Sequence, residues 1–259
     1  MSTIQINNET FNYRLSGPED GPVLFFSNSL GTTHSMWASQ VDYFSKNYRV
    51  FSYDTRGHGG SAKNKGPYTL DQLGNDVLQI TRALGIEKFN FCGISMGGLI
   101  GQWLGINASE NLEKLVICNT AAKIGQEAGW NDRAALVRAQ GMNPVADGSA
   151  GRWFTESFVQ ANPAIVNNLI DGLRQTDAEG YAACCEALAK ADLRDQIAQI
   201  KTPTLIVAGT HDPVTTVADA DAMAEKIAGA SRVDLNASHL SNIEASEAFN
   251  HALEAFLKG

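Results

Sequence analysis

A serine flanked by glycines is the feature of this sequence best suited to covalent chemistry. Ser95 lies in residues 93–97 (GISMG), a G-x-S-x-G pattern that directly follows the apolar run 89–92. A turn from strand to helix with this pattern exposes the serine hydroxyl in a strained backbone conformation, which requires small neighbours. The helix that would begin at Met96 places the partial positive charge of its first turn beneath the serine. The pattern predicts a nucleophile, although a bare G-x-S-x-G also occurs as an ordinary small-residue turn.

A serine nucleophile needs a base that accepts its proton, and chain position selects one of the five histidines. Where the serine lies at such an elbow, the acid and then the histidine follow it along the chain. His239 follows the last strand-like segment, so it is the predicted base. The remaining histidines precede the serine, neighbour the acid candidate or lie in a terminal helical pattern: His34, His58, His211 and His251.

The predicted acid is Asp212, which stands just after the strand-like run 204–208. Pro213 fixes the following turn, so the carboxylate would lie at the edge of the sheet where His239 is expected. A structural alternative is an Asx-type turn or a helix cap, a role that Thr215 or Thr216 could also fill. Three other carboxylates compete less well for the catalytic position: Asp219, Asp221 and Asp234.

Acyl transfer also needs donors for the oxyanion of the tetrahedral intermediate, commonly two backbone N–H groups. One is expected at Met96, the residue after the nucleophile. The other is expected at Leu30, in the loop of residues 27–31 that follows the third predicted strand. Only the backbone N–H acts in this role, so the side chains at these positions are not diagnostic.

The polar, glycine-rich segment 54–61 (DTRGHGGS) has the composition of a site but is interpreted as structural. Its glycines permit a tight turn, and Asp54 and Arg56 are expected to pair locally and hold the loop. His58 is likewise assigned to the scaffold.

The elements that position these residues form an α/β pattern. Apolar, β-rich segments alternate with helical patterns at residues 23–26, 49–53, 89–92, 112–118, 204–208 and 232–235. Such alternation predicts a mostly parallel sheet covered by helices on both faces. Two earlier alternating segments, 3–6 and 11–15, are typical of an antiparallel edge hairpin and bring the predicted total to eight strands.

One stretch interrupts this alternation. Residues 121–195 contain helical patterns but no strand-like run, and they are predicted to form a helical cap inserted after the sixth strand. The core domain is then made of residues 1–120 and 196–259. A cap at this place lies over the C-terminal ends of the strands, where open α/β sheets bind ligands.

Composition excludes several classes of partner. The chain has 259 residues and a formal net charge of −8, which argues against nucleic acid or an anionic membrane as a partner. It has no apolar run near the roughly 20 residues that span a bilayer and no basic-then-apolar N-terminal signal, so a cytoplasmic location is expected. The four cysteines are interpreted as reduced and structural, without zinc-like spacing: Cys92, Cys118, Cys184 and Cys185.

With these motifs in place, the chain resembles the α/β-hydrolase superfamily over nearly its whole length, and most closely the 3-oxoadipate enol-lactonases. The resembling segments are residues 27–32 (SNSLGT), 53–61 (YDTRGHGGS), 119–125 (NTAAKIG) and 180–188 (GYAACCEAL). The last two flank or lie inside the cap, the part that varies most between hydrolases of different substrates, and are the more specific. One departure is Asn28-Ser29, where the superfamily usually has His-Gly.

The resemblance implies hydrolysis of 3-oxoadipate enol-lactone to 3-oxoadipate in the β-ketoadipate pathway of aromatic-compound degradation. It implies a Ser-His-Asp mechanism through an acyl-enzyme, with no metal or organic cofactor. The oligomeric state is left open.

An anionic lactone calls for a cation in the cap. Trp130, Arg133 and Val137 share one helical face. From the residues alone, a pocket role and a solvated or packing role for Trp130 and Arg133 are equally compatible, and the resemblance favours the pocket. Trp153 is a further pocket candidate, and the weaker carboxylate binders are Arg138, Arg152 and Arg174.

Two alternative functions remain open. The first is another serine carboxylesterase or lactonase on the same scaffold. The second, from a different class, is a receptor that binds a lactone and signals through a protein partner. Fast multiple turnover without a partner distinguishes the enzyme from the receptor.

Overall fold

The computed structural model describes residues 2–259 and contains one sheet of eight strands. The strands are β1 (Ser2–Ile6), β2 (Glu9–Ser16), β3 (Val23–Ser27), β4 (Arg49–Tyr53), β5 (Phe89–Ile94), β6 (Leu112–Cys118), β7 (Thr204–Gly209) and β8 (Ser231–Leu235). Their order is β1-β2-β4-β3-β5-β6-β7-β8. β1 pairs with β2 and β2 with β4 in antiparallel fashion, and all other neighbours are parallel.

The central strands are apolar because both faces of the sheet are covered. Every residue of β5 and β7 is buried, as expected for parallel strands between helical layers. Aromatic rings on neighbouring strands stack across the sheet, with centroids 4.5 Å apart for Phe25 and Phe51 and 5.7 Å apart for Phe25 and Phe91. These contacts fix the register of the strands that carry the site residues at their ends.

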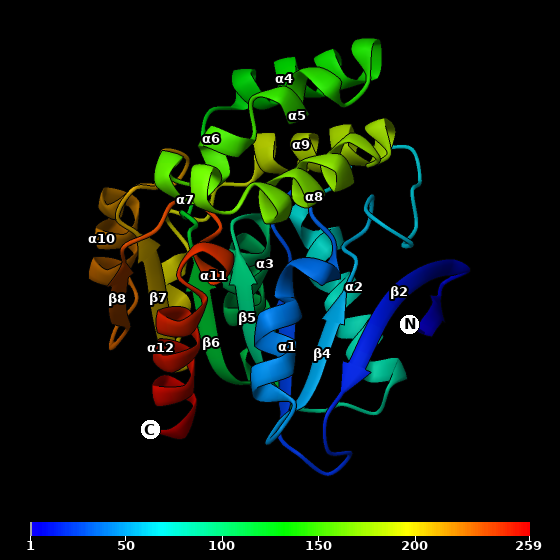
Figure 1. Ribbon diagram of the computed structural model, residues 1–259. Coiled ribbons are helices and arrows are strands. Elements are labelled where there is room, and N and C mark those ends of the chain that lie inside the picture. Colours follow the sequence, from blue (N-terminus) through cyan, green and yellow to red (C-terminus); the bar gives the residue numbers. More distant parts are fainter. Residues whose placement is uncertain (1) are drawn as a thin grey trace.

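Helices flank the sheet on both sides (Figure 1). α1 (Ala38–Phe44) and α12 (Ser246–Lys258) contact each other on one face, whereas α2 (Leu70–Ala83) and α3 (Met96–Asn107) pack together on the other. α10 (Val217–Lys226) packs on β7 and β8 at that side. Of the remaining short helices, η1 (His34–Trp37) and α11 (Ser241–Glu244) lie against α1 and α12, whereas η2 (Ser109–Asn111) and η3 (Ile197–Gln199) lie against α3.

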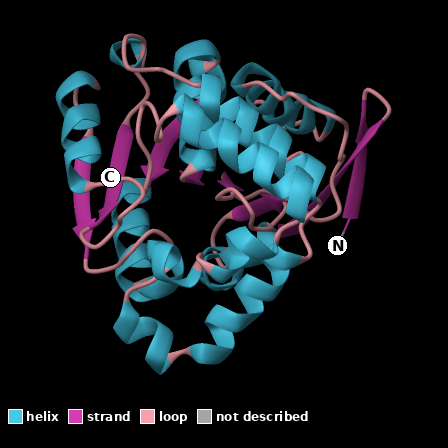
Figure 2. Cartoon of the chain, turned by 90° about the horizontal axis from the view of Figure 1, so that it is seen from above, coloured by secondary structure: helices cyan, strands magenta, loops and turns pink. Residues whose placement is uncertain are grey.

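Six α-helices lie between β6 and β7: α4 (Glu127–Gln140), α5 (Asn143–Asp147), α6 (Ala150–Trp153), α7 (Glu156–Ala161), α8 (Pro163–Arg174) and α9 (Ala178–Lys190). They stand above the C-terminal ends of the parallel strands (Figure 1), and the view from above shows helices in front of the strands (Figure 2). α4 packs along α9, and α9 is capped by Asp177, whose carboxylate accepts a hydrogen bond from Gly180 N–H at 2.8 Å. This layer is the helical cap.

The predicted α/β-hydrolase fold is confirmed. Each expected strand is present, with ends that differ by at most two residues. β2 begins at Glu9 rather than Phe11 because its pairing with β1 extends to the turn, and β5 ends at Ile94 rather than Cys92. The division into residues 1–120, 121–195 and 196–259 as domains stays a prediction, and Met1 lies outside the described residues. In the described part of the chain, no helix has the length and apolar character to cross a membrane.

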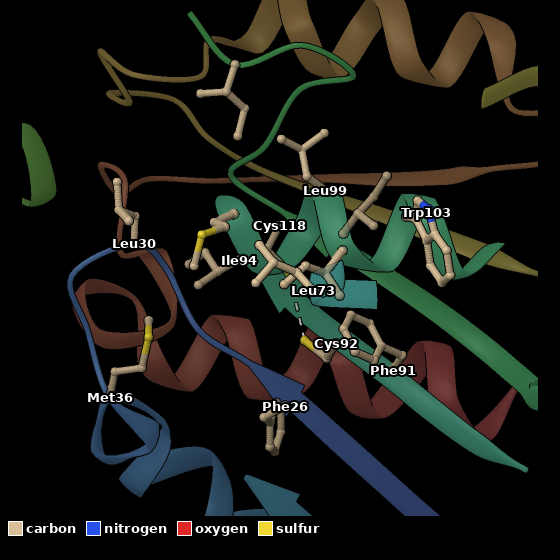
Figure 3. Close-up of a cluster of buried hydrophobic side chains, with 14 of the residues drawn as sticks. Phe26, Leu30, Met36, Leu73, Phe91, Cys92, Ile94, Leu99, Trp103 and Cys118 are labelled. Atoms are coloured by element: carbon tan, nitrogen blue, oxygen red, sulfur yellow. Dashed lines mark hydrogen bonds between the residues drawn. The ribbon is translucent and has the colours of Figure 1, made fainter. Parts of the chain in front are cut away.

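An apolar cluster underlies the end of β5 and the start of α3. Ile94, Leu99, Cys92 and Cys118 are fully buried there (Figure 3). The Sγ atoms of Cys92 and Cys118 lie 3.9 Å apart, and all four cysteines of the chain are buried and free. The cysteines therefore act as small core residues, as predicted. The rigid cluster supports the turn at which Ser95 stands.

Candidate active site

Ser95 occupies the strained turn that its sequence context predicts. Its backbone has φ 58° and ψ −115°, a conformation that costs energy for a residue with a side chain. A Cβ at Gly93 would lie 2.1 Å from the carbonyl oxygen of Gly97, and one at Gly97 would lie 2.3 Å from the carbonyl oxygen of Ser27. Only glycine fits either position. Thr120 Oγ1 donates to the Ser95 carbonyl at 2.8 Å and helps to hold the turn.

His239 and Asp212, 27 residues apart in the chain, meet at the end of the sheet. The distance from His239 Nδ1 to Asp212 Oδ2 is 2.8 Å, and both side chains are buried. A carboxylate can only accept in this bond, so Nδ1 carries the hydrogen and Nε2 is left as the basic nitrogen. The pair is arranged as the acid and base of a serine hydrolase are.

The Asp212 carboxylate is saturated with donors. Its Oδ2 also accepts from Thr215 Oγ1 at 2.8 Å, and its Oδ1 accepts from the N–H groups of Val214 at 2.7 Å and Thr215 at 3.1 Å. Burial alone would raise the pKa of this carboxyl, but His239 and the other donors hold the pKa below its ordinary value. The Asx-type turn considered as an alternative is therefore present as well: Oδ1 forms the turn while Oδ2 orients His239.

Asn119 is a site residue for which the sequence analysis gave no role. Its Nδ2 donates to Asp212 Oδ2 at 3.0 Å and to the Ser238 carbonyl at 3.2 Å, while its Oδ1 accepts from Ser241 Oγ at 2.6 Å. Its φ of 42° lies in the left-handed region, where asparagine is among the better tolerated residues. Its place directly after β6 was the available signal.

Ser95 and His239 face one cavity of about 300 Å³ between the sheet and the cap. The residues that line it come from both layers: Ser29, Leu30, Ser95, Ile124, Gly125, Gln126, Gly129, Trp130, Arg133, Ser149, Arg152, Trp153, Tyr181, Pro213, Val214 and His239. Among residues 2–259 no direct hydrogen bond joins Ser95 Oγ to the His239 ring; such bonds often tighten only when substrate binds. The volume lies at the lower end for small-molecule pockets. No cluster of three or more metal-ligating side chains of the His, Cys, Asp and Glu types occurs in the described chain.

The two expected oxyanion donors lie next to this cavity. Leu30 lines it, and Met96 is the first residue of α3. Within the described residues, neither N–H has an acceptor in the protein. Both groups are thus available to a ligand oxygen.

Two cap arginines reach the cavity without an acidic partner. The guanidinium of Arg133 lies 4.8 Å from the ring centroid of Trp130, a cation–π contact. Arg152 Nη2 donates to the Val145 carbonyl and to Ser149 Oγ, both at 2.8 Å. Burial, and then the nearby charge of Arg133, lowers the pKa of Arg152. Neither guanidinium has a carboxylate within ion-pair distance among residues 2–259.

The other two arginine candidates are engaged elsewhere. Arg138 pairs with Glu179 at 2.8 Å and with Glu186 at 2.5 Å, and Arg174 pairs with Asp147 at 2.8 Å and Asp171 at 3.0 Å. Neither lines the cavity. The structure therefore brings Arg133 and Arg152 to the site, together with Trp130 and Trp153, and keeps Arg138 and Arg174 in surface ion pairs.

The expected pairing of Asp54 with Arg56 is wrong. Arg56 forms a bidentate ion pair with Asp76, in which its Nε and Nη2 each lie 2.7 Å from a carboxylate oxygen, and it also contacts Glu9. Asp54 instead accepts from the ring and the backbone N–H of His34, at 2.8 and 2.9 Å. Two residues apart on a tight turn, the two side chains point to different neighbours, which come from distant parts of the chain.

Comparison with known proteins agrees with this architecture. A family model described as alpha/beta hydrolase fold matches residues 22–143, and one described as TAP-like protein matches residues 174–259. The crystal structure of the enol-lactonase from Burkholderia xenovorans LB400 superposes with a TM-score of 0.98 at 44% identity, covering 100% of both chains. The fold thus defines the protein as an α/β hydrolase.

Two curated relatives narrow the class. Both come from Acinetobacter baylyi (strain ATCC 33305 / BD413 / ADP1) and are named 3-oxoadipate enol-lactonase 2 and 1. The first is 51% identical, covering 99% of this chain and 96% of the relative; the second is 46% identical, covering 100% and 98%. The chain belongs to the family of 3-oxoadipate enol-lactonases and is an enzyme of the carboxylic-ester hydrolase type, as its resemblance implied.

Proposed function

We propose that the protein hydrolyses 3-oxoadipate enol-lactone to 3-oxoadipate by a Ser-His-Asp mechanism. The observation that carries the proposal is that Ser95, the His239–Asp212 pair and two unpaired arginines converge on one cavity. The first three supply acyl-transfer chemistry, and the arginines suit a small anionic substrate. The named relatives support the same reaction.

Acylation begins at the lactone carbonyl. Ser95 Oγ attacks this carbon while His239 Nε2 accepts the hydroxyl proton. The carbonyl oxygen becomes an oxyanion, which the N–H groups of Leu30 and Met96 stabilise. Asp212 keeps the histidine in the required tautomer and stabilises the imidazolium that forms.

Collapse of this intermediate breaks the ring carbon–oxygen bond and opens the lactone. The leaving group is an enolate, which is a better leaving group than an alkoxide and remains attached to the acyl chain. It takes a proton from the protonated His239 and ketonises. Water then gives a proton to His239 and attacks the Ser95 ester, and the proton returns to Ser95 Oγ as 3-oxoadipate leaves.

The substrate carboxylate is assigned to the arginine pair. Arg133 is held over the indole of Trp130, and Arg152 is held by its bonds to Val145 and Ser149, so both cations are oriented before substrate arrives. A carboxylate placed between them gains two charge-assisted partners and relieves the repulsion between the guanidinium groups. Trp130 and Trp153 cover the apolar ring. We place this activity in the β-ketoadipate pathway of aromatic-compound degradation, in the cytoplasm.

The decisive experiment compares wild type with Ser95→Ala on the enol-lactone generated in situ, following its loss by ultraviolet absorbance. We expect repeated turnover by wild type and only the spontaneous rate with Ser95→Ala, a loss of about 10⁴-fold or more. Loss no faster than spontaneous with wild type would reject the assignment.

The same assay separates the alternatives. Turnover of simple carboxylic esters with no activity on the enol-lactone would indicate another esterase or lactonase of this fold. One slow turnover per molecule, with a change in the cap that depends on a protein partner, would indicate a receptor.

A further inference from the structure

A buried histidine outside the catalytic pair is bonded to the loop that carries Leu30. The backbone N–H of Gly31 donates to His58 Nε2 at 2.8 Å, and His58 is 1% exposed. His58 Nδ1 lies 3.2 Å from the Arg56 carbonyl oxygen. Since an amide N–H can only donate and a carbonyl can only accept, the ring must be neutral, with its hydrogen on Nδ1 and its lone pair on Nε2.

The ring is itself held rigidly. His58 N–H donates to the Thr55 carbonyl at 2.9 Å, and the His58 carbonyl accepts from Ser61 N–H at 3.0 Å. Gly57 next to it has a φ of 85°, and a Cβ there would lie 2.6 Å from the carbonyl oxygen of Gly180 at the start of α9. The imidazole therefore presents a fixed acceptor to the Gly31 amide.

Three hydrogen bonds hold the loop of residues 27–34 along its length. Asn28 Nδ2 donates to the Tyr53 carbonyl at 2.8 Å near its start, and His34 N–H donates to Asp54 Oδ1 at 2.9 Å near its end. The hydrogen bond from Gly31 to His58 lies between these two. All three partners belong to β4 or to the segment that directly follows it, so this segment fixes the position of the loop.

The hydrogen bond between Gly31 and His58 affects the neighbouring oxyanion donor, the N–H of Leu30. Leu30 and Gly31 share a peptide unit, and the direction of the Leu30 N–H depends on the backbone angles that the Gly31 bond fixes. Gly31 has a φ of 81°, and a Cβ there would lie 2.5 Å from Leu173 Cδ1 of the cap. Glycine at this place has wide conformational freedom, so the amide orientation needs an external partner.

We propose that His58, as the neutral Nδ1-protonated tautomer, is a positioning residue that holds the Leu30 amide in the direction the oxyanion requires. The inference rests on the proposed function, because it takes Leu30 as an oxyanion donor. His58 touches neither substrate nor Ser95. It acts through Gly31, and the cost of losing it falls on the transition state rather than on substrate binding.

Two substitutions of similar size separate the two bonds of the ring. In His58→Gln, the side-chain oxygen takes the position of Nε2 and still accepts from Gly31. In His58→Asn, the shorter amide takes the position of Nδ1 and keeps the bond to the Arg56 carbonyl but not the one to Gly31. We expect kcat on the enol-lactone to fall about 10- to 100-fold in His58→Asn with KM within about twofold, and to stay within about threefold of wild type in His58→Gln.

A matched control tests for a merely structural effect. Asn90 is also buried, and its Nδ2 donates to the Val23 carbonyl at 3.1 Å near the opposite end of the sheet. Asn90→Leu removes a buried hydrogen bond far from the loop, and we expect it to lower the midpoint of thermal unfolding without changing kcat. Equal kcat values for His58→Asn and His58→Gln would overturn the inference. So would a decrease in kcat in Asn90→Leu similar to that in His58→Asn.

A second readout keeps the inference separate from the proposed function. If wild type does not hydrolyse the enol-lactone, the proposed function fails, and the variants are compared on 4-nitrophenyl acetate, which uses the same oxyanion donors. An alkyl boronic acid forms a tetrahedral adduct on Ser95. Its affinity for His58→Asn should be lower than its affinity for His58→Gln by a factor of about ten or more. Equal boronate affinities would contradict the role assigned to His58.

Discussion

The sheet side and the cap side of the cavity differ in how their charges are compensated. On the sheet side, the Asp212 carboxylate accepts five hydrogen bonds, one of them from His239. On the cap side, Arg133 and Arg152 face the same space with no carboxylate near them among residues 2–259.

This difference separates two tasks. A catalytic carboxylate must keep one orientation through every turnover, so the fold supplies all its partners in advance. A binding cation must keep its charge uncompensated until the ligand arrives, because a permanent partner would compete with the substrate. Arg138 and Arg174 show the contrast within the cap itself: each is neutralised by two carboxylates and lies outside the cavity. The cap thus divides its arginines between structure and recognition.

The largest effect should come from changing the catalytic carboxylate on the sheet side of the cavity. In Asp212→Asn, the side chain can donate to His239 Nδ1 and thereby favour the tautomer in which Nε2 is no longer the base. We expect kcat on the enol-lactone to fall about 10³- to 10⁴-fold, with KM within a few-fold, measured by the absorbance assay with steady-state kinetics. A KM increase that accounts for most of the loss would place Asp212 in substrate binding instead.

An intermediate effect should come from the cap side. Arg133→Met keeps the apolar stem over Trp130 and removes the charge, and we expect kcat/KM to fall about 10- to 100-fold, mainly through KM. Arg138→Met is the matched control on the same helix, since Arg138 is paired with Glu179 and Glu186, and its KM should be unchanged. If the two variants have the same KM, then Arg133, which lines the cavity, contributes no more to substrate binding than Arg138, which does not.

The features of the fold and site that depend on local sequence could be predicted. The elbow needs glycines at fixed spacing, and the order Ser95, Asp212, His239 follows from the order of the strands that carry them. The parallel strands are short apolar runs, so their bounds were predicted to within two residues.

Partners supplied by distant segments could not be predicted. Arg56 pairs with Asp76 and Glu9 rather than Asp54 because packing of α2 and the edge hairpin decides which carboxylates lie nearby. Asn119 supports Asp212 across 93 residues of sequence. Which of the four candidate arginines on the cap helices reach the cavity likewise depends on which face of each helix meets the sheet, and weak amphipathic patterns such as that of α4 do not specify it.

The smallest expected effect concerns His58, a buried histidine on the sheet side whose ring is neutral in the folded protein. Burial lowers the pKa of His58, although the Arg56 carbonyl and the Asp54 carboxylate favour the charged form and Lys63 opposes it. The folded protein therefore keeps this ring neutral at pH values where the unfolded chain, with a pKa of about 6.5, takes up a proton. Stability from this group is complete above pH 6.5 and is lost as the pH falls below it.

We expect the free energy of unfolding of wild type to decrease between pH 6.5 and 5.5 by about 1 kcal/mol more than that of His58→Gln, which has no titrating ring at this position. Urea unfolding at pH 7.5, 6.5 and 5.5 measures both proteins, and the other histidines contribute equally to each. If the free energies of unfolding of wild type and His58→Gln changed in parallel with pH, His58 would carry the same charge in the folded and unfolded states. The His58 ring would then be protonated in the folded protein at pH 5.5, and the hydrogen bond from Gly31, which needs the lone pair of this ring, would be lost.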